Sequence, residues 1–108
     1  MTKDKVVALP FIRRELVEVE IRRIANNSTI DLVKLDHAID RMNEREITDR
    51  QILNVLRSGE RTSEITWDTE RERGWRCVFR RITAGVNATV VAKLVKRNKT
   101  TCLIVTVF

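Results

Sequence analysis

The chain has 108 residues, of which 43% are hydrophobic, and this is enough for one domain with a single modest core. The same content argues against an intrinsically disordered chain. Lys and Arg number 21 against 15 Asp and Glu, so the formal net charge of +6 favours an acidic partner such as RNA, DNA or an acidic protein and says nothing about the fold.

The histidine and cysteine content bears on metals and on location. One histidine, two cysteines and no Cys-x-x-Cys pair argue against a zinc site, and we expect no metal and no cofactor. The longest apolar run is far too short to span a membrane and no apolar leader is recognisable, so we expect a cytoplasmic protein without membrane association. Both thiols should then stay reduced, although a disulfide between Cys77 and Cys102 is feasible if their strands are neighbours.

The N-terminal part predicts a tail and then a helix. We expect residues 1–9 to form a flexible tail and residues 10–108 a single α+β domain. Pro10 fits the first position of a helix that should run from Phe11 to about Asn26. Apolar residues lie on two sides of this helix, so it either packs in two directions or offers one face to a partner. They are Ile12, Leu16 and Val19 on one side, and Val17, Ile21 and Ile24 on the other.

The next segment holds the most informative pattern. Residues 29–35 alternate well enough for a short strand, and Asp36 is a good N-cap for the helix that follows. At about 100° per residue, His37, Arg41 and Arg45 fall within one sector of roughly 80°, beside an apolar sector that would face a core. The two arginines repel each other at i,i+4 spacing, so we expect them to face a concave, electropositive surface that a carboxylate or a phosphate ligand neutralises.

A second helix follows directly and has clear end signals. Thr48 and Gln51 form a capping box, and Ile47 and Ile52 form a hydrophobic staple. Gly59 ends this helix. The sequence therefore predicts two consecutive helices before the pattern changes.

Beyond this helical pair the spacing becomes that of strands. Short polar links between successive strands indicate an antiparallel meander of three or four strands. The predicted strands cover residues 64–68, 75–82, 89–95 and 101–108. The predicted fold class is thus α+β, with an N-terminal helix, a strand, a helical pair and a mostly antiparallel sheet. Seven residues should share one core: Met42, Ile52, Val55, Leu56, Phe79, Leu94 and Ile104.

Several short motifs occur in order along the chain. They are H-A-x-x-R-M-x-x-R-x-I-T from His37, L-x-x-G ending at Gly59, W-R-C from Trp75, A-G at Ala84 and I-V-T-V-F ending at Phe108. In this combination the chain resembles a family of small bacterial proteins with a domain of unknown function, which is itself similar to RelE- and BrnT-type toxins. One departure is Glu46, because members usually have a glycine after the second arginine of the first motif.

This resemblance implies a fold and an activity. It implies a RelE-like toxin fold, in which a helical pair packs on a small sheet, and membership of a toxin–antitoxin system with an antitoxin-like protein as partner. It also implies that RNA is cleaved without a metal. Kinship of fold does not by itself establish activity.

The residues offer the groups that RNA cleavage needs. Attack by a 2′-hydroxyl requires a base, departure of the 5′-oxygen requires an acid, and the anionic phosphorane requires cations. His37 can supply a proton transfer near cytosolic pH, and Arg41 and Arg45 can hold the phosphate. Across the sheet, Arg76 and Arg80 are candidate nucleic-acid contacts, and Trp75 is a candidate for stacking on a base.

Other interpretations remain open at this stage. A histidine in the first turn of a helix is commonly a capping or core-edge residue, and arginines on an amphipathic helix commonly pair with carboxylates such as Glu64 or Asp68. The chain also has no tyrosine and no second histidine. The alternative function is a non-catalytic module that binds nucleic acid or protein. Residues 37–58 could be misread as a helix-turn-helix, but the start of the second helix offers only the polar residues of an ordinary solvated face. A regulatory protein that binds through its first helix or a sheet edge is a third class.

Overall fold

The computed structural model describes residues 11–108, so Pro10 and the predicted tail of residues 1–9 lie outside the described residues. The chain alternates between helices and strands in its first half and consists of strands in its second. The helical elements are η1 (Arg14–Leu16, a 3-10 helix), α1 (Val17–Asn27), η2 (Thr29–Asp31, a 3-10 helix), α2 (Asp36–Arg45) and α3 (Asp49–Ser58). The strands are β2 (Leu32–Lys34), β3 (Glu60–Arg61), β4 (Thr66–Asp68), β5 (Gly74–Thr83), β6 (Val86–Lys96) and β7 (Thr100–Val107).

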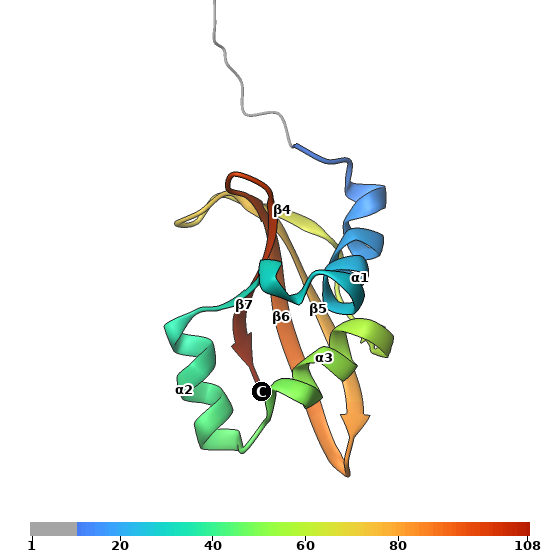
Figure 1. Ribbon diagram of the computed structural model, residues 1–108, viewed down its shortest axis with the longest axis vertical. Coiled ribbons are helices and arrows are strands. Elements are labelled where there is room, and N and C mark those ends of the chain that lie inside the picture. Colours follow the sequence, from blue (N-terminus) through green and yellow to red (C-terminus); the bar gives the residue numbers. More distant parts are fainter. Residues whose placement is uncertain (1–10) are drawn as a thin grey trace, which may run out of the picture.

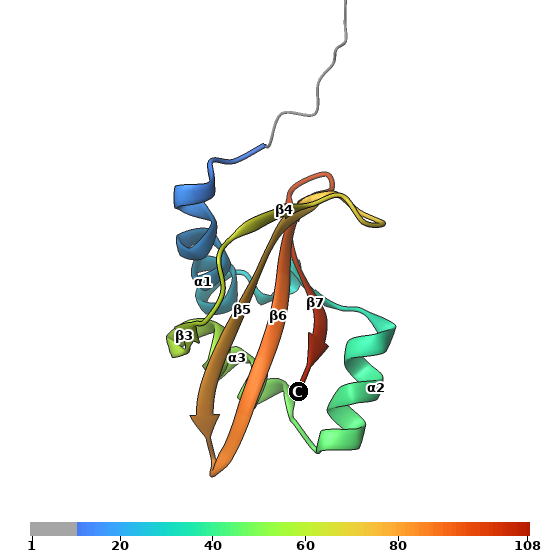
Figure 2. The same ribbon diagram turned by 180° about the vertical axis from the view of Figure 1, so that it is seen from behind.

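The six strands form one mostly antiparallel sheet, which confirms the predicted α+β class. Their order is β2-β7-β6-β5-β3, and β4 also pairs with β5. Strands β5, β6 and β7 form the expected meander, whereas β2 runs parallel to β7. Helices α1 and α3 lie over one face (Figure 1), and the view from behind shows β5, β6 and β7 in front of them with α2 beside β7 (Figure 2).

The core lies between α1, α3 and the covered face of the sheet. All seven predicted core residues are buried, from Phe79 at 0% exposed to Met42 at 9%. Along β5 the side chains alternate, so that Cys77 and Phe79 point into the core and Arg76 and Arg80 point the other way. One face of the sheet is therefore packed, and the opposite face carries charged side chains.

The first helix packs in one direction only. Its buried residues are Val17, Ile21, Ile24 and Ala25, whereas Leu16 and Val19 are exposed. The α-helix begins at Val17, later than predicted, and a 3-10 helix over Arg14–Leu16 precedes it. The carbonyl of Ile12 accepts a hydrogen bond of 2.9 Å from the Trp75 indole N–H, which docks this segment on the sheet.

Other boundaries also differ from the expectation. Leu35, not Asp36, is the N-cap of α2, and Asp36 is the first helical residue, where its charge still favours the helix dipole. The predicted strand over residues 29–35 is only three residues long, because a 3-10 turn occupies its first part. The capping box of α3 is confirmed: the Gln51 N–H donates to Thr48 Oγ1 at 3.2 Å, and the Thr48 N–H donates to Gln51 Oε1 at 2.8 Å.

The two cysteines are not bonded. Strand β6 lies between the strands of Cys77 and Cys102, so the condition for a disulfide is not met, and both thiols are free and buried. Burial raises the pKa of the Cys77 thiol to about 12 and also raises the pKa of Cys102. Neither thiol is therefore ionised enough near neutral pH to act as a nucleophile.

Among the described helices, none has the length and apolar character needed to cross a membrane.

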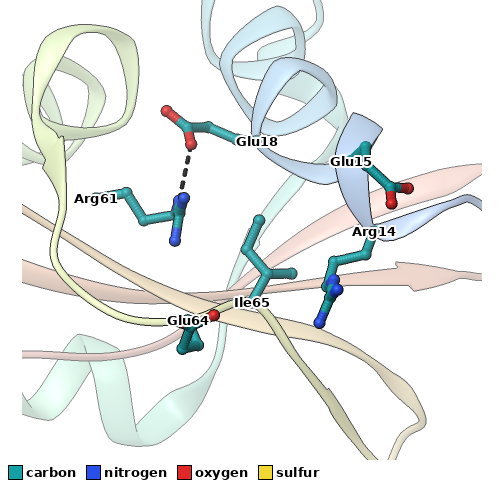
Figure 3. A pocket seen from close by; sticks show the side chains of 6 residues that line it. All are labelled: Arg14, Glu15, Glu18, Arg61, Glu64 and Ile65. Carbon is teal, nitrogen blue, oxygen red and sulfur yellow. Dashed lines mark hydrogen bonds and ion pairs between the residues drawn. The ribbon is translucent and has the colours of Figure 1, made fainter.

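An ion-pair cluster holds α1 against the segment that follows α3. Glu18 accepts hydrogen bonds of 2.8 Å from Arg22 and from Arg61. Figure 3 shows Glu18 and Arg61 facing each other beside a small cavity of about 390 Å³. Hydrogen bonds from Arg61 and Arg22 hold the pKa of Glu18 below its ordinary value of 4.5.

We expect Glu18→Gln to reduce the free energy of unfolding at neutral pH and to weaken its dependence on acid. A carboxylate whose pKa is lowered in the folded state stabilises it above the unfolded pKa, and this contribution is lost as the pH falls through the folded value. The difference between the two proteins should therefore shrink below about pH 4. Urea unfolding across this range measures it, with Glu15→Gln as control, because exposed Glu15 forms no ion pair within residues 11–108. Equal losses in both variants would contradict the role of Glu18.

The turn between α2 and α3 is held by Glu46 in the left-handed conformation, with φ 55° and ψ 42°. Its position closes α2, and the next N–H, of Ile47, donates to the carbonyl of Met42 at 2.9 Å. This conformation is favourable for glycine and costs other residues about 1 kcal/mol. The departure from the resembled motif thus falls on a residue whose backbone suits a glycine.

Glu46→Gly should raise the free energy of unfolding by about 0.5–1 kcal/mol, because glycine adopts this conformation without strain. Glu44→Gly removes the same charge two residues earlier, inside α2, and should lower stability by a similar amount. Chemical denaturation of both variants separates the backbone effect from the charge effect. A loss of stability in Glu46→Gly would contradict it.

Candidate nucleic-acid interface

An open groove of about 990 Å³ is lined by residues of the second sheet face. This is the face that α1 and α3 leave uncovered (Figure 2). Its walls are the start of α2 and the loop between β4 and β5, and its floor comes from β5, β6 and β7. Four basic side chains line it, namely His37, Arg71, Arg76 and Lys93. Carboxylates of Asp36, Asp68, Glu70 and Glu72 also line it, so the groove is mixed in charge.

His37 and Arg76 come together in this groove from separate elements. His37 is the second residue of α2 and is exposed. Arg76 lies on β5 between two buried residues of the core face, and this alternation directs it to the uncovered face. The structure thus brings together one predicted catalytic residue and one predicted nucleic-acid contact that are 39 residues apart in sequence.

Lys93 forms the floor of the groove beside Arg76, which it faces across the β5–β6 pair. Its side chain is only 7% exposed, and Nζ lies 3.3 Å from Asp68 Oδ2 and donates to the Glu70 carbonyl at 2.9 Å. The Glu70 backbone N–H, followed by Lys93, lowers the pKa of Asp68, so this carboxylate stays ionised beside the amine. Lys93 was not expected at the site from the sequence, because a single lysine within an apolar strand is commonly a side chain that reaches solvent.

The loop between β4 and β5 places Arg71 at the groove. Its backbone is left-handed, with φ 63°, and its side chain is exposed. Glu72, next in the loop, accepts two hydrogen bonds of 2.8 and 2.9 Å from Arg97, which tie the loop to the turn after β6. Within residues 11–108, neither Arg71, Arg76 nor His37 forms an ion pair, so these three side chains are available to a ligand.

Arg41 and Arg45 lie outside the groove. At 1.5 Å per residue they stand about 6 and about 12 Å from His37 along α2. Arg41 Nε donates weakly to the Val107 carbonyl at 3.4 Å, and Nη1 lies 3.7 Å from Glu44 Oε1. Arg45 is exposed and forms no ion pair with another described residue. The predicted stripe therefore exists, but only its first member lines the groove.

The remaining candidates divide between the two faces of the sheet. Arg80 shares the uncovered face with Arg76 and forms a long ion pair of 3.8 Å with Glu60. Trp75 lies on the covered face and is 9% exposed, with its ring edge-on to Trp67 at 5.2 Å between centroids. Because adjacent strand residues point to opposite faces, Trp75 cannot stack on a base that Arg76 binds. The two were assigned to one surface on sequence grounds, and the structure separates them.

Comparison with known proteins gives one match. A family described as "Domain of unknown function (DUF4258)" matches residues 35–108. The chain belongs to the DUF4258 family. No curated protein and no solved structure matches the chain. All residues that line the groove lie within the DUF4258 match, whereas α1 precedes it and contributes to the same core.

Proposed function

We propose that this DUF4258 protein binds RNA in the groove and cleaves it without a metal ion, as its resemblance to RelE- and BrnT-type toxins implies. One observation carries the proposal. His37, Arg71 and Arg76 come from a helix, a loop and a strand, and they line one open groove without ion-pair partners among the described residues. An exposed imidazole that shares a groove with two guanidinium groups suits a phosphodiester, because the set combines proton transfer with charge stabilisation.

In the proposed reaction the 2′-oxygen of the RNA forms a bond to phosphorus, and the bond between phosphorus and the 5′-oxygen breaks. The proton of the 2′-hydroxyl passes to a groove carboxylate, for which Asp36 is the candidate, because the Glu70 N–H and Lys93 hold Asp68 in its ionised form. The imidazolium of His37 gives its proton to the departing 5′-oxygen. Arg71 and Arg76 stabilise the negative charge that builds up on the phosphorane. The products are a 2′,3′-cyclic phosphate and a free 5′-hydroxyl.

Arg41 and Arg45 take a different part in this proposal from the one first expected. Their distance from His37 along α2 suits contacts to neighbouring phosphates better than contacts to the reacting one. Lys93 is a positioning residue, because its ammonium is committed to Asp68 and to the Glu70 carbonyl. It thereby fixes the loop that carries Arg71.

A second candidate function is binding of nucleic acid without a reaction. It is favoured by the absence of any hydrogen bond between His37 and another side chain within residues 11–108, since acid–base residues are commonly oriented by such a partner. The two candidates share the groove and differ in whether RNA is cut.

The protein should cleave RNA in the presence of a chelator and leave 2′,3′-cyclic phosphate or 3′-phosphate ends. His37→Ala should lower the rate by about 100-fold or more, which is the usual contribution of an acid–base residue. Arg76→Ala should weaken both binding and cleavage. Arg81→Ala is the matched control, because Arg81 is exposed on the same strand and points to the opposite face. Circular dichroism verifies that each variant is folded.

Growth after induced expression provides an independent readout of the toxin interpretation. The parent protein should arrest growth, and His37→Ala should not. If the purified protein binds RNA but leaves it intact, or if His37→Ala cleaves as fast as the parent, the nuclease assignment is wrong and the binding module takes its place.

A further inference from the structure

A second cluster of side chains lies on the uncovered sheet face, about four residues along the strands from the groove. Its members are Arg80 on β5, Thr89 on β6 and Phe108 after β7. Arg80 is the register partner of Thr89, and Thr89 and Phe108 exchange two backbone hydrogen bonds of 2.9 Å. Directly opposite residues in an antiparallel pair share a face, so the three side chains form a row across the sheet.

Phe108 has an unusual environment for an aromatic residue of this chain. Trp75 and Phe79 are buried, and Phe11 and Trp67 are half-buried against the core. Phe108 is 45% exposed and is the one exposed aromatic side chain within residues 11–108. The Arg41 guanidinium lies over its ring, 5.9 Å from the centroid, at the outer limit of a cation–π contact.

We propose that Phe108, Arg41 and Arg80 form a nucleobase subsite in which a base stacks on the Phe108 ring. The proposal rests on RNA binding in the groove and extends it. Proteins that bind single strands combine aromatic platforms with basic side chains that follow the backbone, and this row offers both. Arg80 lies in the same row as Phe108, on β5, and its 3.8 Å contact with exposed Glu60 is loose enough to exchange for a phosphate.

The subsite and the groove lie on one path. Arg76 and Arg80 point to the same face and are separated by four residues, or about 13 Å along β5. Between the two basic rows, Val78 faces Val91 across the β5–β6 pair. An RNA strand bound at Arg76 and running along β5 would pass over Val78 and Val91 and reach Phe108 within a few nucleotides. The same geometry narrows the part of Arg41, which then binds beside the base on Phe108 and not at the reacting phosphate.

The test measures binding separately from cleavage. The probe is a fluorescent hexaadenylate with 2′-O-methyl riboses, which cannot be cut because the nucleophile is blocked, and a matched abasic oligomer that carries the phosphates alone. Fluorescence anisotropy is recorded for the full chain and for Phe108→Ala, Phe108→Leu, Phe108→Trp and Arg80→Ala. Phe108→Leu keeps an apolar side chain without a ring face, and Arg81→Ala again controls for charge.

Phe108→Ala and Phe108→Leu should weaken binding of hexaadenylate about fivefold or more, as loss of one stacked base predicts. Neither should change binding of the abasic oligomer, and Phe108→Trp should restore the affinity for hexaadenylate. Arg80→Ala should weaken binding of both oligomers and reduce the salt dependence by about one phosphate contact. Arg81→Ala should change neither.

Two contrary outcomes are distinguishable. If Arg76→Ala weakens hexaadenylate binding while Phe108→Leu does not, the base subsite is wrong and the groove stands. If the full chain binds neither oligomer, the subsite and the proposed function fall together. Binding that depends on Phe108 in a protein that never cleaves RNA supports the subsite and rejects the nuclease.

Discussion

Arg22 ties together the three parts of the packed side of the molecule. From α1, its guanidinium donates to the carbonyls of Leu56 and Gly59 at the end of α3, at 3.0 and 2.8 Å, and lies 5.1 Å from the centroid of the Phe79 ring on β5. Glu18 balances its charge from the next turn of the helix. Gly59 lets the end of α3 lie against β5, because a Cβ atom there would overlap the Val55 carbonyl and lie 2.9 Å from the Arg80 carbonyl. Helices α1 and α3 are therefore held on the same face of the sheet.

This one-sided packing creates the candidate interface. Because α1 and α3 occupy the same face and α2 lies beside β7, every second residue of β5 and β6 is directed to a face that no described helix crosses. A charge that is buried on this face needs polar partners, and Lys93 has them in Asp68 and the Glu70 carbonyl. Arg76 and His37 line the same groove and are exposed. The groove is therefore a consequence of where the helices pack and not of a separate binding element.

The sequence was most informative where the pattern was long and regular. Strands β5, β6 and β7, the capping box of α3 and the seven core residues all follow from hydrophobic spacing and end signals. Strand β3 has two residues, too few for any periodicity. The segment before α1 is docked by a hydrogen bond from Trp75 to the Ile12 carbonyl, a tertiary contact that local sequence does not encode. The separation of Trp75 from Arg76 could have been predicted, because adjacent residues of a strand point to opposite faces of the sheet. By contrast, His37 and Arg76 line the same groove because β2 pairs with β7 and thereby places the start of α2 beside the sheet.

Glu46 and Arg71 both have left-handed backbones, but their side chains differ in where they lie. At Glu46 the side chain is exposed and only the backbone conformation is needed, so a glycine would serve better. At Arg71 the same conformation presents a guanidinium to the groove, and a glycine would lose that cation. The loop tolerates the cost of about 1 kcal/mol because ion pairs fix it on both sides of Arg71, from Asp68 to Lys93 and from Glu72 to Arg97. A left-handed residue is common in the short loop between two antiparallel strands, so the hairpin accounts for the backbone of Arg71, and the placement of its side chain at the groove follows from it.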